Sequence, residues 1–363
     1  MPKRKRYTNN KYKKCGICKR NIRNKSRKVC YICYKIKKLF KPSGNKIIDD
    51  FIRYTQSDNQ NEQGMEFVSF DQFKNIEFIA EGGFSKIYKA IWVNGPIYNW
   101  HYIKNRNTSN TSRRQNYSVV LKKLNDSKDV TSKQLNELKV SYQIFSKMKW
   151  NGFVSIDKII EIMAVRMELS YHVTSENICQ YFGITQEPIT KDIMIIMPYY
   201  DLGDLTNYIG NYFYNIRWQT KLIHLWSIMN ALRTMHEQEI IHKDLHSGNI
   251  LINDDDIVIG DFGISKSATE STDDNNENYG IIPYMAPEIF QGKKYTKDSD
   301  IYSFGMIMWE FMTGRRPFWD RIHDTELIIE ICDGLRPPII TNAPEGYIDL
   351  MKECWHADPD KRP

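Results

Sequence analysis

Apolar and polar residues alternate along much of the first half of the chain, whereas the second half contains longer segments with apolar residues at helical spacing. Period-two alternation predicts strands, and it predicts three of them here, at 76–80, 86–93 and 118–124. A helix is predicted over 132–148, where four apolar residues share one face: Leu135, Leu138, Tyr142 and Phe145. A β-rich half followed by an α-rich half predicts an α+β fold.

Polar stretches divide this pattern into parts. Residues 54–66 are almost free of aliphatic side chains, which predicts a flexible linker over 49–69. Residues 94–117 are polar and irregular, as expected of an exposed loop, and a further helical pattern at 156–169 has no assigned place. The 363 residues therefore divide into a short N-terminal module, a linker and one large domain.

The net charge of +7 conceals a strong asymmetry along the chain. Residues 1–48 contain eighteen Lys or Arg and no Asp or Glu. Removing these eighteen from the total of 51 leaves 33 basic against 44 acidic residues, a net charge of −11 for the remainder. This division predicts two units with different partners.

No segment is apolar over the length that a membrane span requires, and charged residues rather than an apolar stretch follow Met1. The longest apolar candidate, 301–313, is interrupted by Glu310 and predicts a buried helix. We therefore expect no membrane contact and a cytoplasmic or nuclear localisation, where free thiols persist.

Four of the seven cysteines lie in the basic segment as two Cys-x-x-Cys pairs separated by eleven residues: Cys15, Cys18, Cys30 and Cys33. Zinc prefers tetrahedral thiolate sites of this kind. A segment this small and this charged cannot fold by apolar burial alone, so a bound metal would supply the folding free energy. The sequence predicts a structural zinc module over 1–48, with a disordered basic arm of redox-labile thiols as the alternative.

The basic segment also fits more than one kind of partner. Its positive charges are interleaved with tyrosines, which suits nucleic acid or an acidic protein surface. Residues 2–6 (PKRKR) match a nuclear import signal as well. These alternatives stay open at the level of sequence.

Phosphoryl transfer requires a held triphosphate, placed metal charges and an aligned hydroxyl, and candidate residues for each requirement occur in chain order. Gly82 and Gly83 lie in the turn between the first two strands, where a missing Cβ lets the backbone approach phosphate oxygens. Lys122 lies inside an apolar strand and needs a partner, for which Glu137 on the following helix is suitable. Each feature alone also fits an ordinary hairpin turn or a surface lysine.

The most specific pattern is IIHKDLHSGN at 240–249, followed twelve residues later by Asp261 in the triplet DFG. Asp244 can accept the proton of an incoming hydroxyl, and Asn249 and Asp261 offer oxygen ligands to magnesium. The two motifs in this order and spacing favour a phosphoryl-transfer enzyme over coincidence.

These residues resemble the signature set of eukaryotic protein kinases, and the resemblance covers the chain from about Phe70 to Pro363. The segments IIMPYYDLGDL, GIIPYMAPE and SDIYSFGMIMWEFMTGRRPF are most similar to the tyrosine-kinase-like group, especially its expanded fungal members. The resemblance implies a bilobal kinase domain, with a β-rich lobe at 70–200, an α-helical lobe at 201–363 and a final helix beyond the end of this sequence. It also implies ATP, Mg²⁺ and protein substrates phosphorylated on serine or threonine.

The resemblance further implies a role for each matching residue. Asp244 would be the base, Lys122 with Glu137 would position the phosphates, and Asn249 with Asp261 would hold Mg²⁺. Asp300 would brace the catalytic loop, and Arg362 would pair with Glu288. The positions that would contact the nucleotide are Ala80, Gly82, Gly83, Ser85, Ile87, Val120, Lys122, Met197, Pro198, Tyr200, Asn249 and Asp261.

Several positions depart from the family's pattern. Ala80 and Ser85 replace the outer glycines of the phosphate loop. His246 lies where serine/threonine kinases generally carry a lysine, and Ile281 replaces the threonine that contacts that lysine. A dual-specificity or tyrosine kinase is therefore an alternative. The rivals from other classes are a pseudokinase scaffold that only binds nucleotide, and a nucleic-acid binder regulated by its kinase domain.

Overall fold

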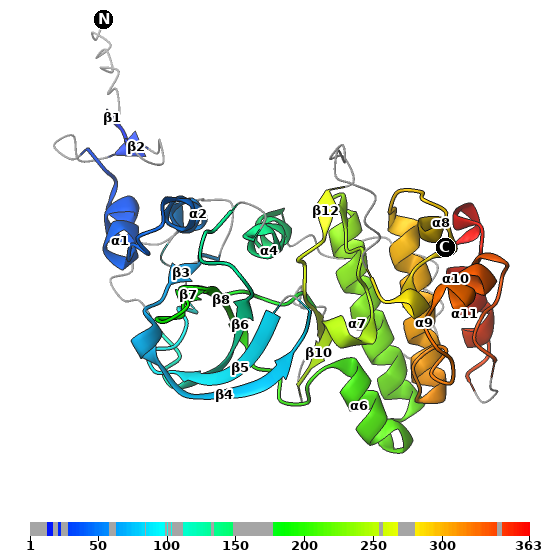
Figure 1. Ribbon diagram of the computed structural model, residues 1–363. Coiled ribbons are helices and arrows are strands. Elements are labelled where there is room, and N and C mark those ends of the chain that lie inside the picture. Colours follow the sequence, from blue (N-terminus) through cyan, green and yellow to red (C-terminus); the bar gives the residue numbers. More distant parts are fainter. Residues whose placement is uncertain are drawn as a thin grey trace, which may run out of the picture. The chain divides into compact units, whose positions relative to one another are not determined.

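The computed structural model describes residues 13–16, 21–22, 28–57, 63–83, 85–98, 100, 103, 112–131, 134–147, 177–253, 257–267, 280–339 and 343–363. The chain forms two compact units (Figure 1). Unit 1 comprises 1–131 and 182–197, and unit 2 comprises 132–181 and 198–363. Unit 1 contains the largest sheet and unit 2 contains most of the helices, which confirms the predicted α+β class.

Unit 1 is built on a six-stranded sheet in the order β3-β7-β8-β6-β5-β4 (Figure 1). Its strands are β3 (Glu66–Phe67), β4 (Phe73–Glu81), β5 (Ser85–Trp92), β6 (Tyr117–Leu124), β7 (Gly183–Gln186) and β8 (Ile193–Pro198). The three strands expected from the alternating pattern are β4, β5 and β6. Alternate residues of β5 and β6 are fully buried in one apolar cluster, including Ala90, Trp92, Val119 and Leu121.

The N-terminal part of unit 1 contains β1 (Lys13–Lys14), β2 (Asn21–Ile22), α1 (Tyr31–Leu39) and α2 (Lys46–Ser57). The prediction of a linker over 49–69 is wrong in its secondary structure, because α2 and β3 both extend into this range. α2 buries Ile48, Phe51 and Ile52, which lie on one helical face. Two polar residues complete its packing, since Gln56 Nε2 donates to the Met65 carbonyl at 2.8 Å and Thr55 Oγ1 accepts from the Met65 amide at 3.1 Å.

The predicted exposed loop at 94–117 also differs from the structure. Ile97, Trp100 and Ile103 are buried in one apolar cluster with Ile36, and Leu39 packs against it. Helix α1 of the basic segment therefore rests on this loop within unit 1. Apolar residues spaced three apart inside a polar stretch gave too weak a pattern to predict this packing.

Unit 2 is mainly helical. Its helices are α4 (Asn136–Lys147), α6 (Leu205–Tyr212), α7 (Trp218–His236), α8 (Pro287–Phe290), α9 (Lys297–Thr313), α10 (Thr325–Cys332) and α11 (Tyr347–Cys354). Its strands are β9 (Ile240–Ile241), β10 (Ile250–Ile252), β11 (Ile257–Ile259) and β12 (Lys266–Ser267). The helical pattern at 156–169 lies outside the described residues.

Both units also contain short 3-10 helices: η1 (Phe70–Gln72) in unit 1, and η2 (Phe213–Asn215), η3 (Ser247–Asn249), η4 (Ile282–Tyr284) and η5 (Pro359–Lys361) in unit 2. Helix α9 is buried over nearly its whole length, as predicted for 301–313. A capping box between Thr296 and Ser299 begins it, and Gly314 ends it in the left-handed region. Among the described residues, no helix has the length and apolar content to cross a membrane.

Candidate active site

A buried carboxylate holds the loop that carries Asp244. Asp300 accepts the backbone N–H of His242 at 2.8 Å and that of Lys243 at 3.0 Å, and its Oδ2 lies 2.8 Å from His236 Nε2. Lys243 has a φ of +72°, a conformation that L-residues rarely adopt without support. Asp300 therefore braces the loop, as expected from the sequence.

Asn249 orients Asp244 from the other side. Its Nδ2 donates to the Asp244 carbonyl at 2.9 Å and lies 3.4 Å from Asp244 Oδ2. The Asp244 side chain is 27% exposed, so its carboxylate is held but remains accessible to a substrate hydroxyl. Because the donor end of the Asn249 amide is engaged, its oxygen end is available to a cation.

The pairing of β10 with β11 brings the second oxygen ligand to the same place. Ile250 is paired with Ile259, and the Gly260 N–H donates to the Asn249 carbonyl at 2.9 Å. Asp261 follows directly, with a φ of +55°. A carboxylate and an amide oxygen are hard ligands of the kind that Mg²⁺ takes, so this pair fits the metal that the kinase resemblance implies.

Phe262 connects this region to helix α4. The Phe262 ring is fully buried and makes edge contacts with Tyr181 and His242, at centroid distances of 6.2 and 5.7 Å. Tyr181 donates its hydroxyl to Glu137 Oε1 at 2.5 Å. Burial raises the pKa of Tyr181 well above its usual value, so the phenol stays a donor. Tyr181 therefore links Glu137 to Phe262 through one hydrogen bond and one ring contact.

Two further polar side chains hold the same segment. His242 Nε2 lies 3.0 Å from the Gly260 carbonyl. Asn136, at the start of α4, donates Nδ2 to the carbonyls of Phe262, Gly263 and Ser265 at 3.0–3.3 Å. Sequence reasoning missed Tyr181 and Asn136, because their partners are 44 and up to 129 residues away and no local pattern marks them.

The predicted phosphate loop is the β4–β5 turn of unit 1. Ala80 is paired with Ile87, and the Gly82 N–H donates to the Ser85 carbonyl at 2.8 Å. A Cβ on Gly82 would meet nothing closer than 4.0 Å, and one on Gly83 would meet nothing within that distance. The turn itself therefore does not require glycine, which favours close approach of a ligand as the reason for both residues.

The remaining predicted nucleotide contacts lie on β6 and around the end of β8. Val120 and Lys122 are on β6, where Lys122 is buried and paired with Ile87 across the sheet. Met197 and Pro198 end β8, and Met197 and Tyr200 are buried. Lys122 belongs to unit 1 and Glu137 to unit 2, so their pairing stays a prediction.

The two departures at the catalytic centre have different surroundings. His246 accepts the Gly248 N–H on Nδ1 at 3.0 Å, so a neutral imidazole carries its proton on Nε2. That Nε2 lies 3.7 Å from Asp244 Oδ1. Ile281 is 42% exposed. The place of the usual lysine is thus taken by a ring whose protonated nitrogen faces the carboxylate.

A buried network lies next to this loop. The Ser247 hydroxyl lies 2.7 Å from Thr206 Oγ1 and 3.1 Å from the Tyr284 hydroxyl. Tyr284 in turn donates to Glu310 Oε1 at 2.5 Å. Burial raises the pKa of Glu310 to about 7, because desolvation disfavours the carboxylate more than these hydrogen bonds favour it.

We expect Glu310→Gln to remove a stability change near neutral pH. The pKa of Glu310 in the folded state lies above its usual value of 4.5. The contribution of this group to the free energy of unfolding is therefore fully present below about pH 4.5 and is lost as the pH rises through about 7. The Tm of wild type should therefore fall relative to that of Glu310→Gln between pH 5 and pH 8. Thermal unfolding of both proteins across this range measures the difference.

Burial lowers the pKa of His224 to about 4, which gives this histidine an opposing effect on the pH dependence of stability. Taking the difference in Tm between wild type and Glu310→Gln removes that effect, because both proteins contain His224. This histidine makes the folded state less stable as the pH falls from its usual value towards 4, in both proteins alike. A Tm difference that does not change with pH would contradict the prediction for Glu310.

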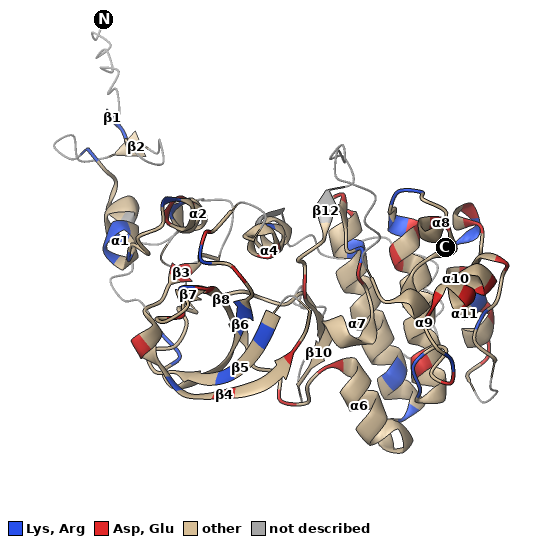
Figure 2. Cartoon of the chain, viewed as in Figure 1, with Lys and Arg blue, Asp and Glu red and all other residues tan. Residues whose placement is uncertain are grey.

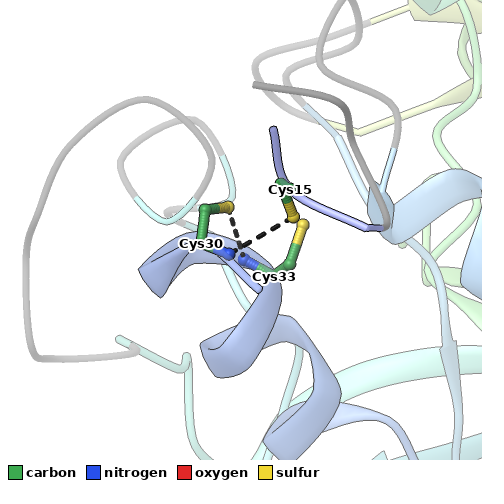
Figure 3. A group of neighbouring side chains, drawn as sticks. All are labelled: Cys15, Cys30 and Cys33. Carbon is green, nitrogen blue, oxygen red and sulfur yellow. Dashed lines mark hydrogen bonds between the residues drawn. The ribbon is translucent and has the colours of Figure 1, made fainter. Parts of the chain in front are cut away.

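Three of the four predicted zinc ligands meet in unit 1 (Figure 3). The sulfur atoms of Cys15, Cys30 and Cys33 all lie within 4.8 Å of one another, and the first and last of these residues are buried. The Cys30 N–H donates to Cys15 Sγ at 3.2 Å, and the Cys33 N–H donates to Cys30 Sγ at 3.4 Å. Cys18 lies outside the described residues.

Comparisons with known proteins agree with the geometry of unit 2. A family model described as protein tyrosine and serine/threonine kinase matches residues 155–363. The chain is 29% identical over 236 residues to a protein of Acanthamoeba polyphaga mimivirus named serine/threonine-protein kinase/receptor R831, covering 61% of this chain and 14% of that protein. It is 35% identical over 210 residues to a Dictyostelium discoideum protein named serine/threonine-protein kinase roco5. That match covers 54% of this chain and 7% of roco5.

A third relative carries a broader name. The chain is 32% identical over 189 residues to the serine/threonine/tyrosine-protein kinase HT1 of Arabidopsis thaliana, covering 52% of this chain and 48% of HT1. The chain thus spans less than half the length of each of these three relatives.

Proposed function

This chain belongs to the protein tyrosine and serine/threonine kinase family, and from that premise we propose that it transfers the γ-phosphate of ATP to serine and threonine hydroxyls of proteins. The kinase domain would span 70–363. The observation that carries the proposal is the environment of Asp244, a partly exposed carboxylate that Asn249 orients in a loop braced by Asp300.

In the proposed reaction, Asp244 accepts the proton of the substrate hydroxyl. The hydroxyl oxygen forms a bond to the γ-phosphorus, and the bond between the γ-phosphorus and the β-phosphate oxygen breaks, which releases ADP. Lys122 and Glu137 would position the phosphates. Asn249 and Asp261 would hold Mg²⁺, which when bound neutralises charge on the phosphates. The hydrogen bond from Asn249 to Asp244, and those from the neighbouring loop backbone to Asp300, would keep Asp244 aligned.

The names of the relatives and the residue at position 246 bear on whether serine, threonine or tyrosine accepts the phosphate. R831 and roco5 are named serine/threonine kinases, whereas the name of HT1 includes tyrosine. The sequence segments that resemble the tyrosine-kinase-like group and its fungal members also support phosphorylation of serine and threonine. We propose serine and threonine as the main acceptors, with dual specificity as the alternative because His246 replaces a lysine that serine/threonine kinases generally carry.

The experiment is transfer of labelled phosphate from ATP to generic protein substrates, followed by separation of the phosphoamino acids. Phosphoserine and phosphothreonine are the expected products. Predominant phosphotyrosine would establish the alternative specificity. A folded protein that binds ATP and Mg²⁺ but transfers no phosphate would be a scaffold instead.

We also propose that the thiol cluster of unit 1 binds one structural Zn²⁺, with Cys18 as the fourth ligand. Two buried cysteines and a third within 4.8 Å support this, as does the pair of N–H donors to sulfur, which stabilises thiolates. Cys30 is also the N-cap of α1. A metal here would fix the start of the helix that packs on Trp100 and Ile103.

We expect metal analysis of the purified chain to find about one zinc per molecule. Cys30→Ser should lose most of it, because one thiolate ligand is removed while the serine hydroxyl can still cap α1. Cys179→Ser serves as the matched control, since that buried cysteine belongs to unit 2. Equal zinc content in wild type and Cys30→Ser, or none in wild type, would contradict the site.

The basic segment next to this cluster fits an anionic partner. Tyr31 and Tyr34 are exposed on α1, with Lys35 Nζ 4.9 Å and Lys38 Nζ 5.0 Å from their respective ring centroids. The helix contains three lysines and no acidic residue, and its ribbon has blue segments but no red ones (Figure 2). Nucleic acid and an acidic protein both match this chemistry. Steeply salt-dependent binding of RNA or DNA oligonucleotides would identify the first.

A further inference from the structure

The loop that follows α9 forms an open, positively charged pocket. A cavity of about 450 Å³ is lined by Arg315, Arg316, Trp319, Arg321 and His323, all of which are exposed. We call it the arginine pocket. Arg and Trp are the side chains most often responsible for affinity at protein interfaces.

Two of the three guanidinium groups are not neutralised. Arg321 forms an ion pair with Glu330. Arg315 lies over the Trp319 ring, 4.3 Å from its centroid, and neither Arg315 nor Arg316 has an ion pair among the described residues. Two exposed guanidiniums beside an aromatic ring offer a forked donor surface for carboxylates.

The loop also contains the exposed Asp320, which acts electrostatically on Arg321, and two further acidic side chains nearby are engaged in other contacts. Asp324 caps helix α10 by accepting the N–H groups of Glu326 and Leu327, at 3.1 and 3.2 Å. Glu330 is the partner of Arg321. Arg315 and Arg316 are both exposed and have no ion pair among the residues that the structure describes.

The loop is fixed by buried contacts at both ends. Gly314 is in the left-handed region, and a Cβ there would meet the Phe213 ring at 2.7 Å. Phe318 is buried in a cluster with Leu327 and Ile331, at a φ of +55°. His323 Nε2 lies 3.1 Å from the Phe318 carbonyl. A pocket held in this way loses little conformational entropy when a ligand binds.

The pocket is adjacent to the network that contacts the catalytic loop. Burial raises the pKa of Glu310, and the nearby Arg316 guanidinium acts in the opposite direction. Glu310 accepts the Tyr284 hydroxyl, which lies 3.1 Å from Ser247 Oγ, and Ser247 is three residues from Asp244. Arg316 of the pocket therefore acts electrostatically on the buried network that also contacts the catalytic loop.

We propose that the arginine pocket binds an acidic stretch of the protein substrate, so that the enzyme prefers serine and threonine residues flanked by Asp and Glu. The unpaired charges of Arg315 and Arg316 recognise the carboxylates, and Trp319 packs against the peptide backbone. This proposal rests on the proposed kinase function, since it assigns the substrate class of the same active site.

Binding can be tested apart from catalysis. A fluorescent peptide with one serine and several Asp and Glu residues is titrated with the full chain carrying Asp244→Asn, and its anisotropy gives Kd. The double variant Arg315→Glu/Arg316→Glu should weaken binding by about tenfold or more. Arg315→Gln/Arg316→Gln, which only removes the charges, should give an intermediate value.

The matched control is Lys293→Glu/Lys352→Glu, which makes the same charge change at exposed lysines of the same unit. We expect its Kd to equal that of the unsubstituted pocket. With Asp244 intact, the ratio of kcat/KM for the acidic peptide to that for a neutral peptide should fall about tenfold in the double variant. Steady-state kinetics on both peptides measure that ratio.

Several results would overturn the proposal. One is equal binding of the acidic peptide and a neutral peptide of the same length. Another is an equal loss of affinity in the control Lys293→Glu/Lys352→Glu, which would show that the peptide responds to the overall charge of the unit and not to the pocket. Tight binding only of a phosphoserine peptide or of an RNA oligonucleotide would assign the pocket to a different ligand. Wild type that binds the acidic peptide at the pocket but phosphorylates no substrate would contradict the kinase function and leave the pocket standing.

Discussion

Replacing Asp244 with Asn is expected to lower kcat for phosphate transfer by about 10³-fold. The amide cannot accept the hydroxyl proton, whereas its size matches that of the carboxylate. The hydrogen bond from Asn249 Nδ2 to the residue 244 carbonyl, and those from the loop backbone to Asp300, do not involve the substituted group. The fold and the KM for ATP should therefore change little, and labelled phosphate transfer measures the loss.

Asp333→Asn is the matched control, because it makes the same chemical change at an exposed aspartate at the end of α10. Its kcat should stay within about twofold of wild type. An Asp244→Asn protein that keeps more than about a tenth of the wild-type kcat would show that Asp244 is not the base. The arrangement around it would then serve another purpose, such as binding without turnover.

Arg362→Ala is expected to destabilise unit 2 by about 3–5 kcal/mol, the usual effect of breaking a buried ion pair. The Arg362 side chain is fully buried and donates to both carboxylate oxygens of Glu288, at 2.6 and 2.8 Å. It also donates to the carbonyls of His356 and Asp298, each at 2.9 Å. Removing it leaves a buried charge on Glu288, so the Tm should fall by roughly 10 °C.

Thermal unfolding followed by circular dichroism tests this expectation. Lys361→Ala is the control at the neighbouring exposed position and should leave the Tm nearly unchanged. Arg362→Lys should lie between the two, because a lysine keeps the charge but cannot form both hydrogen bonds to Glu288. If Arg362→Ala and Lys361→Ala have the same Tm, the ion pair contributes nothing to stability.

Both residues were identified from the sequence, although in different ways. Asp244 followed from the chemistry of a carboxylate spaced five residues from an amide and followed by a second carboxylate motif. Arg362 and its partner Glu288 came only from resemblance to kinases, since 74 residues separate them. The brace from Asp300 to the loop at His242 was likewise expected from the family, and the structure confirms both contacts.

Other predictions were wrong because a local pattern was too short to reveal burial. The linker expected at 49–69 contains α2 and β3, since polar Gln56 and Thr55 are buried through hydrogen bonds to Met65 rather than exposed. The loop expected to be exposed contains Trp100, which is buried beneath α1. Burial of these side chains depends on partners distant in the sequence.

The sequence by itself determined the α+β class, three strands of the largest sheet (β4, β5 and β6) and the residue types that can carry phosphoryl transfer. These depend on periodicity and on side chains within a few positions of one another, which short-range sterics and chemistry control. Only the tertiary structure decided which side chains contact Glu137 and Phe262, how the Cys thiols gather, and where Arg315 and Arg316 are exposed together. Such contacts join segments tens to more than a hundred residues apart, and they form because packing of the whole chain places them together.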